Sequence, residues 1–225
     1  IGIGYHMKAT FGAPDENVEL RFDDDGKITF TTGTQAIGQG HETSFPQIIS
    51  DLLGIPAEDI HYRAGDTDLI AFGGGHGSSR ATFMAGTAIF MAVEVIKEKG
   101  RRIAASMLEA SEADLEFADG AFGIAGTDRN VGLMEVAAKA REIGDPLDTY
   151  QHFTREHHTF PNGCHVAEVE VDPDTGVSRL VRYTAVDDYG TVVNPLLVHG
   201  QMHGAIAQGV GQALICLLYT SPSPR

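Results

Sequence analysis

Positive charge is scarce in this chain, and that scarcity excludes classes of partner. Lysine and arginine number 16 against 31 aspartates and glutamates, so the formal net charge is −15. This charge repels nucleic acid and anionic membrane surfaces at long range. The expected partners are therefore small molecules and other proteins.

Cysteine and long apolar runs are also scarce. Only Cys164 and Cys216 are present, too few for a disulfide framework and without metal-ligand spacing. No apolar run reaches the length of a membrane span, and no signal-peptide pattern appears at Ile1, where the sequence is already strand-like. We therefore expect a cytoplasmic protein, without a membrane span, whose natural start lies upstream of Ile1.

The residues that are present form short alternating and helical patterns. Alternating runs around turn residues predict three β-hairpins, at 17–33, 115–124 and 164–188. A strand near 59–65 and a polar connector over 148–162 are also expected. Helical spacing predicts helices over 43–53, with a start between 40 and 43, over 79–108 and over 131–143, and a glycine-rich helix after Asn194-Pro195. Because strands and helices do not alternate regularly, the predicted fold class is α+β, with hairpins packed against helices.

The chain is expected to form two lobes followed by a tail. Residues 1–145 would form the first lobe of a ligand-binding domain, and residues 146–214 an incomplete second lobe. Residues 215–225, ICLLYTSPSPR, neither continue the apolar helical face nor form a cap, and they resemble translated vector or adapter sequence. We expect a non-native tail there, and a natural disordered tail is the alternative.

Two glycine-rich segments directly precede predicted helices and are candidates for a binding site. They are Gly38-Gln39-Gly40 and residues 73–80, GGGHGSSR. Glycines allow an anion to approach the free N–H groups of a helix N-terminus. The second segment lacks the lysine of a phosphate loop, and neither shows a dinucleotide fingerprint, which disfavours ATP and NAD. Plain turns and helix caps are an equally good explanation of the glycines alone.

Glutamine points to the kind of ligand. Its amide offers two donors and an acceptor, the complement of a heterocycle edge such as that of a pterin. Gln35, Gln39 and Gln201 are candidates to bind such an edge, while Ser78 and Ser79 hold a phosphate. A generic phosphate-binding α+β domain is a weaker alternative.

Five motifs in fixed order carry a resemblance to a known family. They are GTQAIGQGHETSFPQIISDLLGIP, RAGDTD, GGGHGSSRATFMAGTA, HVAEVEVDPDTG and DDYGTVVNPLLVHGQMHGAIAQGVGQAL. Together they resemble the second molybdopterin-binding region of the molybdenum hydroxylases: xanthine dehydrogenase, aldehyde oxidase and the large subunit of aerobic carbon monoxide dehydrogenase. The resemblance covers residues 1–214.

The resemblance implies a cofactor, its contacts and its partners. The cofactor would be molybdopterin cytosine dinucleotide, and iron-sulfur clusters and FAD would lie on partner subunits or domains of a dimer of heterotrimers. Members of the family oxidise a carbon centre of a small molecule, such as an aldehyde, an N-heterocycle or CO, with water as the oxygen source. By position, the cofactor contacts fall on Gly38, Gln39, Gly40, Gly77, Ser78, Ser79, Arg80 and Gln201.

The sequence departs from the family at its catalytic base. The family's glutamate belongs to a Gly-x-Gly-Glu stretch beyond the last helix, and no glutamate follows Glu170 here. The catalytic residue is therefore unknown, and this chain alone is expected to be inactive. A non-catalytic module that binds a pterin cofactor or a partner subunit is the alternative function.

Two other clusters are expected to have no catalytic or metal-binding role. His157, His158, Cys164 and His165 match no zinc spacing, so no metal site on side chains is predicted. Asp187 and Asp188 are expected to form a turn or cap rather than an acid/base pair.

Overall fold

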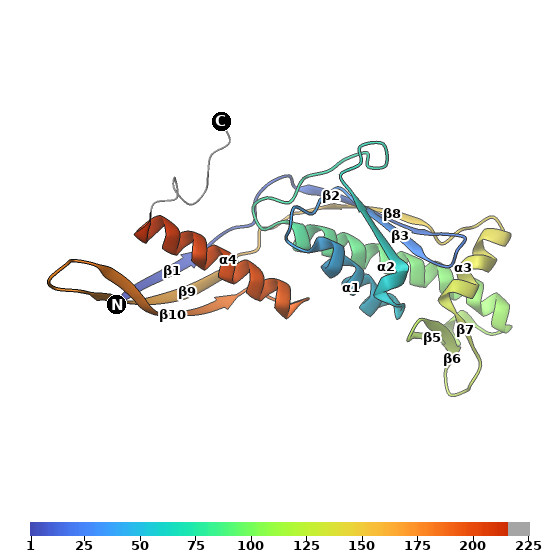
Figure 1. The fold of residues 1–225 in the computed structure, drawn as a ribbon. Coiled ribbons are helices and arrows are strands. Elements are labelled where there is room, and N and C mark those ends of the chain that lie inside the picture. The colour runs from blue at the N-terminus through green and yellow to red at the C-terminus, as the bar shows by residue number, and fades with distance from the viewer. Residues whose placement is uncertain (216–225) are drawn as a thin grey trace. The chain divides into compact units, whose positions relative to one another are not determined.

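The computed structural model of the chain describes residues 1–215, in two compact units. The larger unit is Phe11–His157, and the smaller unit joins Ile1–Thr10 to the chain from His158 onward (Figure 1). The first ten residues join the later part of the chain because β1 (Gly2–Met7) pairs with β9 (Asn162–Val171). These boundaries differ from the expected division at 145/146, and the extent of the lobes in a longer subunit stays a prediction.

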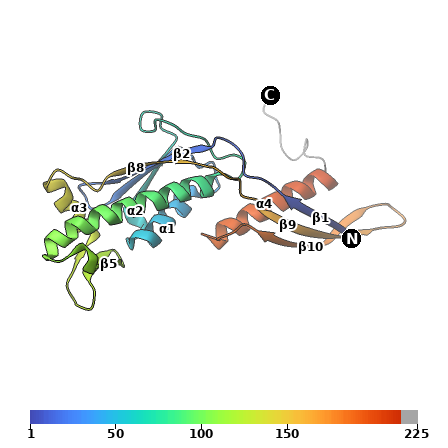
Figure 2. The same ribbon diagram turned by 180° about the vertical axis from the view of Figure 1, so that it is seen from behind.

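The larger unit is built on a four-stranded sheet in the order β4-β3-β2-β8. Helix α1 connects β3 to β4, which is why these two strands are parallel while the other pairs are antiparallel. Helices α1 and α2 lie against one face of this sheet, as both views show (Figures 1 and 2). The bounds are β2 Asp15–Phe22, β3 Ile28–Thr32, α1 His41–Leu53, β4 Ile60–Ala64, α2 Ala81–Leu108 and β8 Thr149–Thr154.

A small second sheet follows α2. Strands β5, β6 and β7 pair antiparallel in that order, and α3 continues directly from β7. Short 3₁₀ turns over Ala57–Asp59 and Glu112–Asp114 lead into β4 and β5. The bounds are β5 Leu115–Ala118, β6 Ala121–Ile124, β7 Asn130–Gly132 and α3 Leu133–Glu142.

All of the buried hydrophobic side chains of the described residues belong to the larger unit. They run from Val18 to Leu147, and the long helix α2 contributes the largest share. Ile89, Ala92 and Ile96 of α2 are fully buried, and α2 packs against β2, β8 and α1. Burial of apolar area stabilises a fold roughly in proportion to that area, so this core is the main source of stability of the described structure.

The smaller unit is a three-stranded antiparallel sheet and one helix. The sheet order is β1-β9-β10, with β10 at Ser178–Asp188, and α4 spans Pro195–Leu214. Helix α4 begins where the side chain of Asn194 accepts a hydrogen bond from Leu197 N at 3.1 Å, an N-cap that leaves Pro195 in the first turn. No helix within residues 1–215 combines the length and hydropathy needed to cross a bilayer.

Most predicted elements are confirmed, and so is the α+β class. All three hairpins and all four helices are present. The prediction of a connector over 148–162 was wrong in part, because residues 149–154 form β8. The polar outward residues of this edge strand weaken its pattern, and its pairing with β2, more than 100 residues earlier, cannot be seen locally. The predicted tail at 215–225 lies outside the described residues except for Ile215.

Candidate functional site

The loops that contain the two glycine-rich segments, residues 33–40 and 73–80, are in contact in the larger unit. The first lies between β3 and α1 and the second between β4 and α2. Their backbones touch at Gly33 and Gly73, where a Cβ added to Gly33 would lie 2.4 Å from Gly73 Cα. The Thr34 hydroxyl also donates to Gly75 O at 3.5 Å. The two loops that lead into α1 and α2 are therefore in contact with each other.

Gln39 shapes the first loop. Its Oε1 accepts from Ile37 N at 2.6 Å and its Nε2 donates to Gln35 O at 3.3 Å. Gly38 and Gly40 have positive φ, 106° and 80°, which glycine adopts without steric cost. One amide N–H and one lone pair of Gln39 stay available for a ligand, and a Cβ on Gly38 would meet no atom of the chain.

The second loop contains two consecutive strained residues. Ser78 and Ser79 have φ of 61° and 59°, the left-handed region that a non-glycine residue adopts only at an energetic cost. Such strain persists where the surrounding structure enforces it, frequently at functional sites. A Cβ on the preceding Gly77 would meet nothing within 4 Å, so the loop leaves open space beside these hydroxyl-bearing residues.

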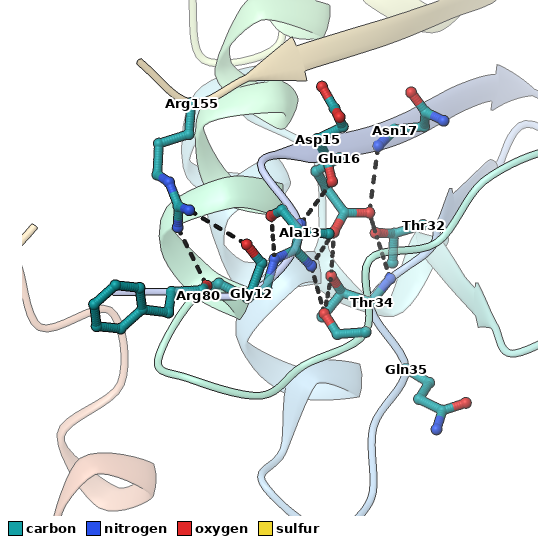
Figure 3. Close-up of polar contacts among 12 residues, drawn as sticks. Gly12, Ala13, Asp15, Glu16, Asn17, Thr32, Thr34, Gln35, Arg80 and Arg155 are labelled. Carbon is teal, nitrogen blue, oxygen red and sulfur yellow. Dashed lines mark hydrogen bonds and ion pairs between the residues drawn. The ribbon is translucent and has the colours of Figure 1, made fainter. Parts of the chain in front are cut away.

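The side chain of Arg80 acts inside the fold rather than on its surface. It is fully buried, and its Nη1 lies 2.8 Å from Glu16 Oε2. Its Nε donates to Ala13 O at 3.1 Å and its Nη2 to Asp15 O at 2.7 Å, and Nη1 also contacts Gly75 O. Figure 3 shows this guanidinium surrounded by the carboxylate and the carbonyls. Arg80 therefore positions the second loop.

Glu16 connects this arrangement to the first loop. Its Oε2 accepts from the Thr34 hydroxyl at 2.5 Å, and its Oε1 from the Thr32 hydroxyl at 3.4 Å. A buried carboxylate is stabilised by such hydrogen bonds and by the facing guanidinium. Sequence reasoning missed Glu16, because it lies on β2 and nothing local pairs it with Arg80, 64 residues later.

Two histidines at the loops have unsatisfied ring nitrogens. Within residues 1–215, Nδ1 of His41 and Nδ1 of His76 are buried without a hydrogen-bond partner. His41 stacks on Phe45, with ring centroids 4.8 Å apart. Burial lowers the pKa of His41, and the nearby His76 adds to the effect. His41 is therefore neutral near pH 7. Nδ1 of His41 and Nδ1 of His76 each need a polar partner that a ligand could supply. In the sequence, only the adjacent Gly40 and Gly77 indicated that these histidines lie at a binding site.

Gln201 lies apart from this group in the chain. It is an exposed residue of α4, which belongs to the smaller unit. Seven of the eight predicted cofactor residues therefore lie in the larger unit, and Gln201 lies in the smaller one. Asp188 behaves as the expected turn residue, since its Oδ1 accepts from Gly190 N at 2.9 Å.

Comparison with known proteins identifies the family. The sequence model of the protein family described as molybdopterin cofactor-binding domain matches residues 1–220. The chain belongs to this family. Its curated relatives include the carbon monoxide dehydrogenase large chain of Afipia carboxidovorans, 34% identical over 95% of this chain and 29% of the relative. Another is subunit gamma of the 6-hydroxypseudooxynicotine dehydrogenase complex of Paenarthrobacter nicotinovorans, 40% identical over 84% and 25%.

Solved structures agree with this assignment. A Cu,Mo-CO dehydrogenase in its carbon monoxide reduced state gives a TM-score of 0.84 at 34% identity, covering 90% of this chain and 28% of that one. Quinoline 2-oxidoreductase from Pseudomonas putida 86 also gives 0.84, at 32% identity, covering 94% and 29%. This chain thus spans less than a third of the length of these molybdopterin enzymes.

The two loops fit the group that the family binds. A molybdopterin cofactor carries phosphate and a pterin whose edge has donors and acceptors. The loops offer the N-termini of α1 and α2, neither of which has a side-chain cap, and the helix dipole favours anions there. The unsatisfied nitrogens of His41 and His76 supply polar groups beside them.

Proposed function

We propose that this chain is the part of a molybdenum hydroxylase large subunit that holds the molybdopterin cofactor. The observation that carries the proposal is the joined pair of glycine loops at two uncapped helix N-termini. Plain turns would explain the glycines, but they would not explain why a fully buried ion pair holds the two loops together. The open space at Gly38 and Gly77 supports a bound group at this surface.

The cofactor in this proposal is molybdopterin cytosine dinucleotide. The backbone N–H groups around Gly38 and Gly40 and the hydroxyls of Ser78 and Ser79 hold phosphate or polar groups of the cofactor, because such donors suit anionic oxygens. The spare amide groups of Gln39 bind a heterocycle edge. By the sequence resemblance, Gln201 is a further predicted contact of this cofactor.

The intact subunit would oxidise a carbon centre, with water as the oxygen source. The bound cofactor supplies the metal that activates this oxygen and accepts two electrons. The relatives are named for carbon monoxide, 6-hydroxypseudooxynicotine and quinoline, and the proposed substrate is a small molecule such as an aldehyde, an N-heterocycle or CO. A glutamate outside this chain would serve as general base.

Partner subunits complete the proposed assembly. The relatives include chains described as a complex subunit gamma and as a large subunit. We place iron-sulfur clusters and FAD on partner subunits, in a cytoplasmic dimer of heterotrimers. A non-catalytic module that binds the cofactor or a partner is the alternative, and the catalytic glutamate discriminates between the two.

The test uses the complete large subunit co-expressed with its partners. Molybdenum content and the cytidine nucleotide released by acid are measured in Gly77→Ala, Ser78→Gly and Gln201→Ala variants. A Cβ at Gly77 clashes with nothing in the chain, and glycine relieves the strain at Ser78. We therefore expect folded variants that retain less molybdenum and less nucleotide than the parent, by about tenfold if each loses one strong contact.

Gln212→Ala is the matched control. Gln212 is an exposed glutamine on the same helix as Gln201, about 16 Å further along the axis. It should keep full cofactor content. Parent-like molybdenum in the Gly77 and Ser78 variants would overturn the proposed site. Full molybdenum without oxidation of CO, aldehydes or N-heterocycles would favour the non-catalytic alternative.

A further inference from the structure

A second cluster of functional side chains lies on the sheet of the smaller unit. His6 on β1 and Asp187 on β10 both lie opposite Gly163 of β9, and His165 is two residues further along β9. Side chains two residues apart on a strand share a face. The three side chains therefore project from the same face of three adjacent strands.

Their ligand atoms are spaced as a bound metal ion requires. Asp187 Oδ1 lies 3.0 Å from His165 Nε2 and 3.8 Å from His6 Nε2, and one ligand atom from each residue lies within 4.8 Å of the others. Metal–ligand bonds of about 2.1 Å in tetrahedral geometry place neighbouring ligand atoms about 3.4 Å apart. The two observed distances bracket this value, so small side-chain rotations suffice to bind an ion.

Asp187 carries the observation that points to a ligand. Its side chain is 1% exposed, and within residues 1–215 its Oδ2 has no hydrogen-bond partner. An unsatisfied buried carboxylate oxygen costs free energy unless a proton or cation meets it. The hydroxyl of neighbouring Tyr189 interacts with this carboxylate and lies 3.6 Å from Met202 Sδ.

Small residues make room for the site. A Cβ on Gly163 would lie 1.8 Å from Asp187 Oδ1 and 2.8 Å from His6 Cε1. Gly4 and Ala185 lie opposite His165 on the neighbouring strands. These neighbouring residues are therefore too small to fill the space beside the three side chains.

A further hydrogen bond orients His165. Its Nδ1 lies 2.7 Å from the Tyr183 hydroxyl, which leaves Nε2 directed at Asp187. Histidine ligands in proteins almost always use their second nitrogen in this way, which fixes the tautomer and the ring orientation. The adjacent Cys164 points to the other face of the sheet by strand alternation and does not belong to the cluster.

We propose that His6, His165 and Asp187 form a binding site for a divalent transition metal ion of the zinc class. Two imidazoles and one carboxylate suit Zn²⁺. His6 is half-exposed, so the ion reaches the site from solvent and keeps one position for water. The site uses no residue of the two glycine loops.

The test is Zn²⁺ and Co²⁺ titration of the metal-free chain in a His199→Gln/His203→Gln background. These histidines stand one helical turn apart on α4, with rings 6.3 Å apart, and would otherwise offer a second site. We expect one ion per chain and the strong visible absorption of tetrahedral Co²⁺. His6→Gln and Asp187→Asn should each weaken Zn²⁺ binding by at least about 100-fold, and Tyr183→Phe by about tenfold.

The His6→Gln variant is informative even if His165 and Asp187 are needed for folding. It removes the most exposed ligand and leaves the His165–Asp187 pair in place, so strand content by circular dichroism should not change. The same variant in the assembled complex should lose zinc and keep molybdenum. Unchanged Zn²⁺ affinity in His6→Gln and Asp187→Asn, or no zinc in the parent chain and complex, would overturn the proposal.

Discussion

The guanidinium of Arg80 and the carboxylate of Glu16 lie 2.8 Å apart, and both side chains are fully buried. Arg80 belongs to the loop before α2 and Glu16 to β2, and Glu16 also accepts from Thr34 in the loop before α1. One ion pair thus holds both glycine loops on the sheet. Glycine loops alone would sample many conformations, so this pair is the element that gives the candidate site a fixed shape.

Removing one member of this ion pair should lower the free energy of unfolding of the larger unit. Glu16→Gln leaves the Arg80 charge buried without its counter-ion, and we expect a loss of about 3–5 kcal/mol in the free energy of unfolding. Urea unfolding measured by circular dichroism checks this. Glu170→Gln, which breaks the exposed pair with Arg179, is the control and should keep the parent midpoint. Equal midpoints for both variants would contradict the assigned role of Glu16.

The contact between Gly33 and Gly73 should tolerate no side chain. In Gly33→Ala the new Cβ would meet Gly73 Cα at 2.4 Å and Phe72 O at 2.6 Å, so the loops must separate, at a cost of about 1–3 kcal/mol. Gly77→Ala adds the same methyl group to the same pair of loops but meets nothing. Thermal unfolding should show a lower midpoint for the first variant only. A parent-like midpoint in Gly33→Ala would show that the loops are not in backbone contact.

Protonation of His41 at acidic pH should lower the stability of the larger unit. Burial lowers the pKa of this imidazole below its ordinary value of 6.5. Between the two pKa values the unfolded chain binds more protons than the folded one, so stability rises with pH in that window. The stabilising contribution of neutral His41 is therefore fully present above about pH 6.5, and it decreases as the pH falls below that value.

His41→Phe measures this contribution. The phenyl ring keeps the stacking on Phe45 but cannot take up a proton. The difference in unfolding free energy between pH 7.5 and pH 5.5 should be smaller in this variant than in the parent. His199→Gln, at an exposed position on α4, should keep the parent pH dependence. If His41→Phe keeps it too, the acid sensitivity arises elsewhere.

The two compact units should differ in resistance to proteolysis. The buried hydrophobic side chains lie between Val18 and Leu147, and α4 has no buried residue. Local opening needs little free energy where few apolar contacts are broken. A broad-specificity protease should therefore cut α4 and the β9–β10 hairpin first and leave a fragment close to Phe11–His157, identified by mass spectrometry. Early cuts within α2 would contradict this order.

The hairpins and helices could be predicted because their signals are local. Asp25 and Gly26 make the β2–β3 turn, where Gly26 has φ of 82° and Asp25 Oδ1 accepts from Lys27 N at 3.2 Å. Periodic apolar residues likewise predict α2 within two residues of its observed start. The motifs that indicated the molybdenum hydroxylase family were equally local, and the family comparison confirmed them.

The sequence by itself determined most of the helices and hairpins, the α+β class and the family. Tertiary structure alone decided which distant residues meet. Strand pairing at long range placed β8 beside β2, joined Glu16 to Arg80, and brought His6, His165 and Asp187 to one face. Their positions are separated by up to 181 residues along the chain. Such contacts depend on the register between strands and on which side chains are buried together, and neither has a signature in a short stretch of sequence.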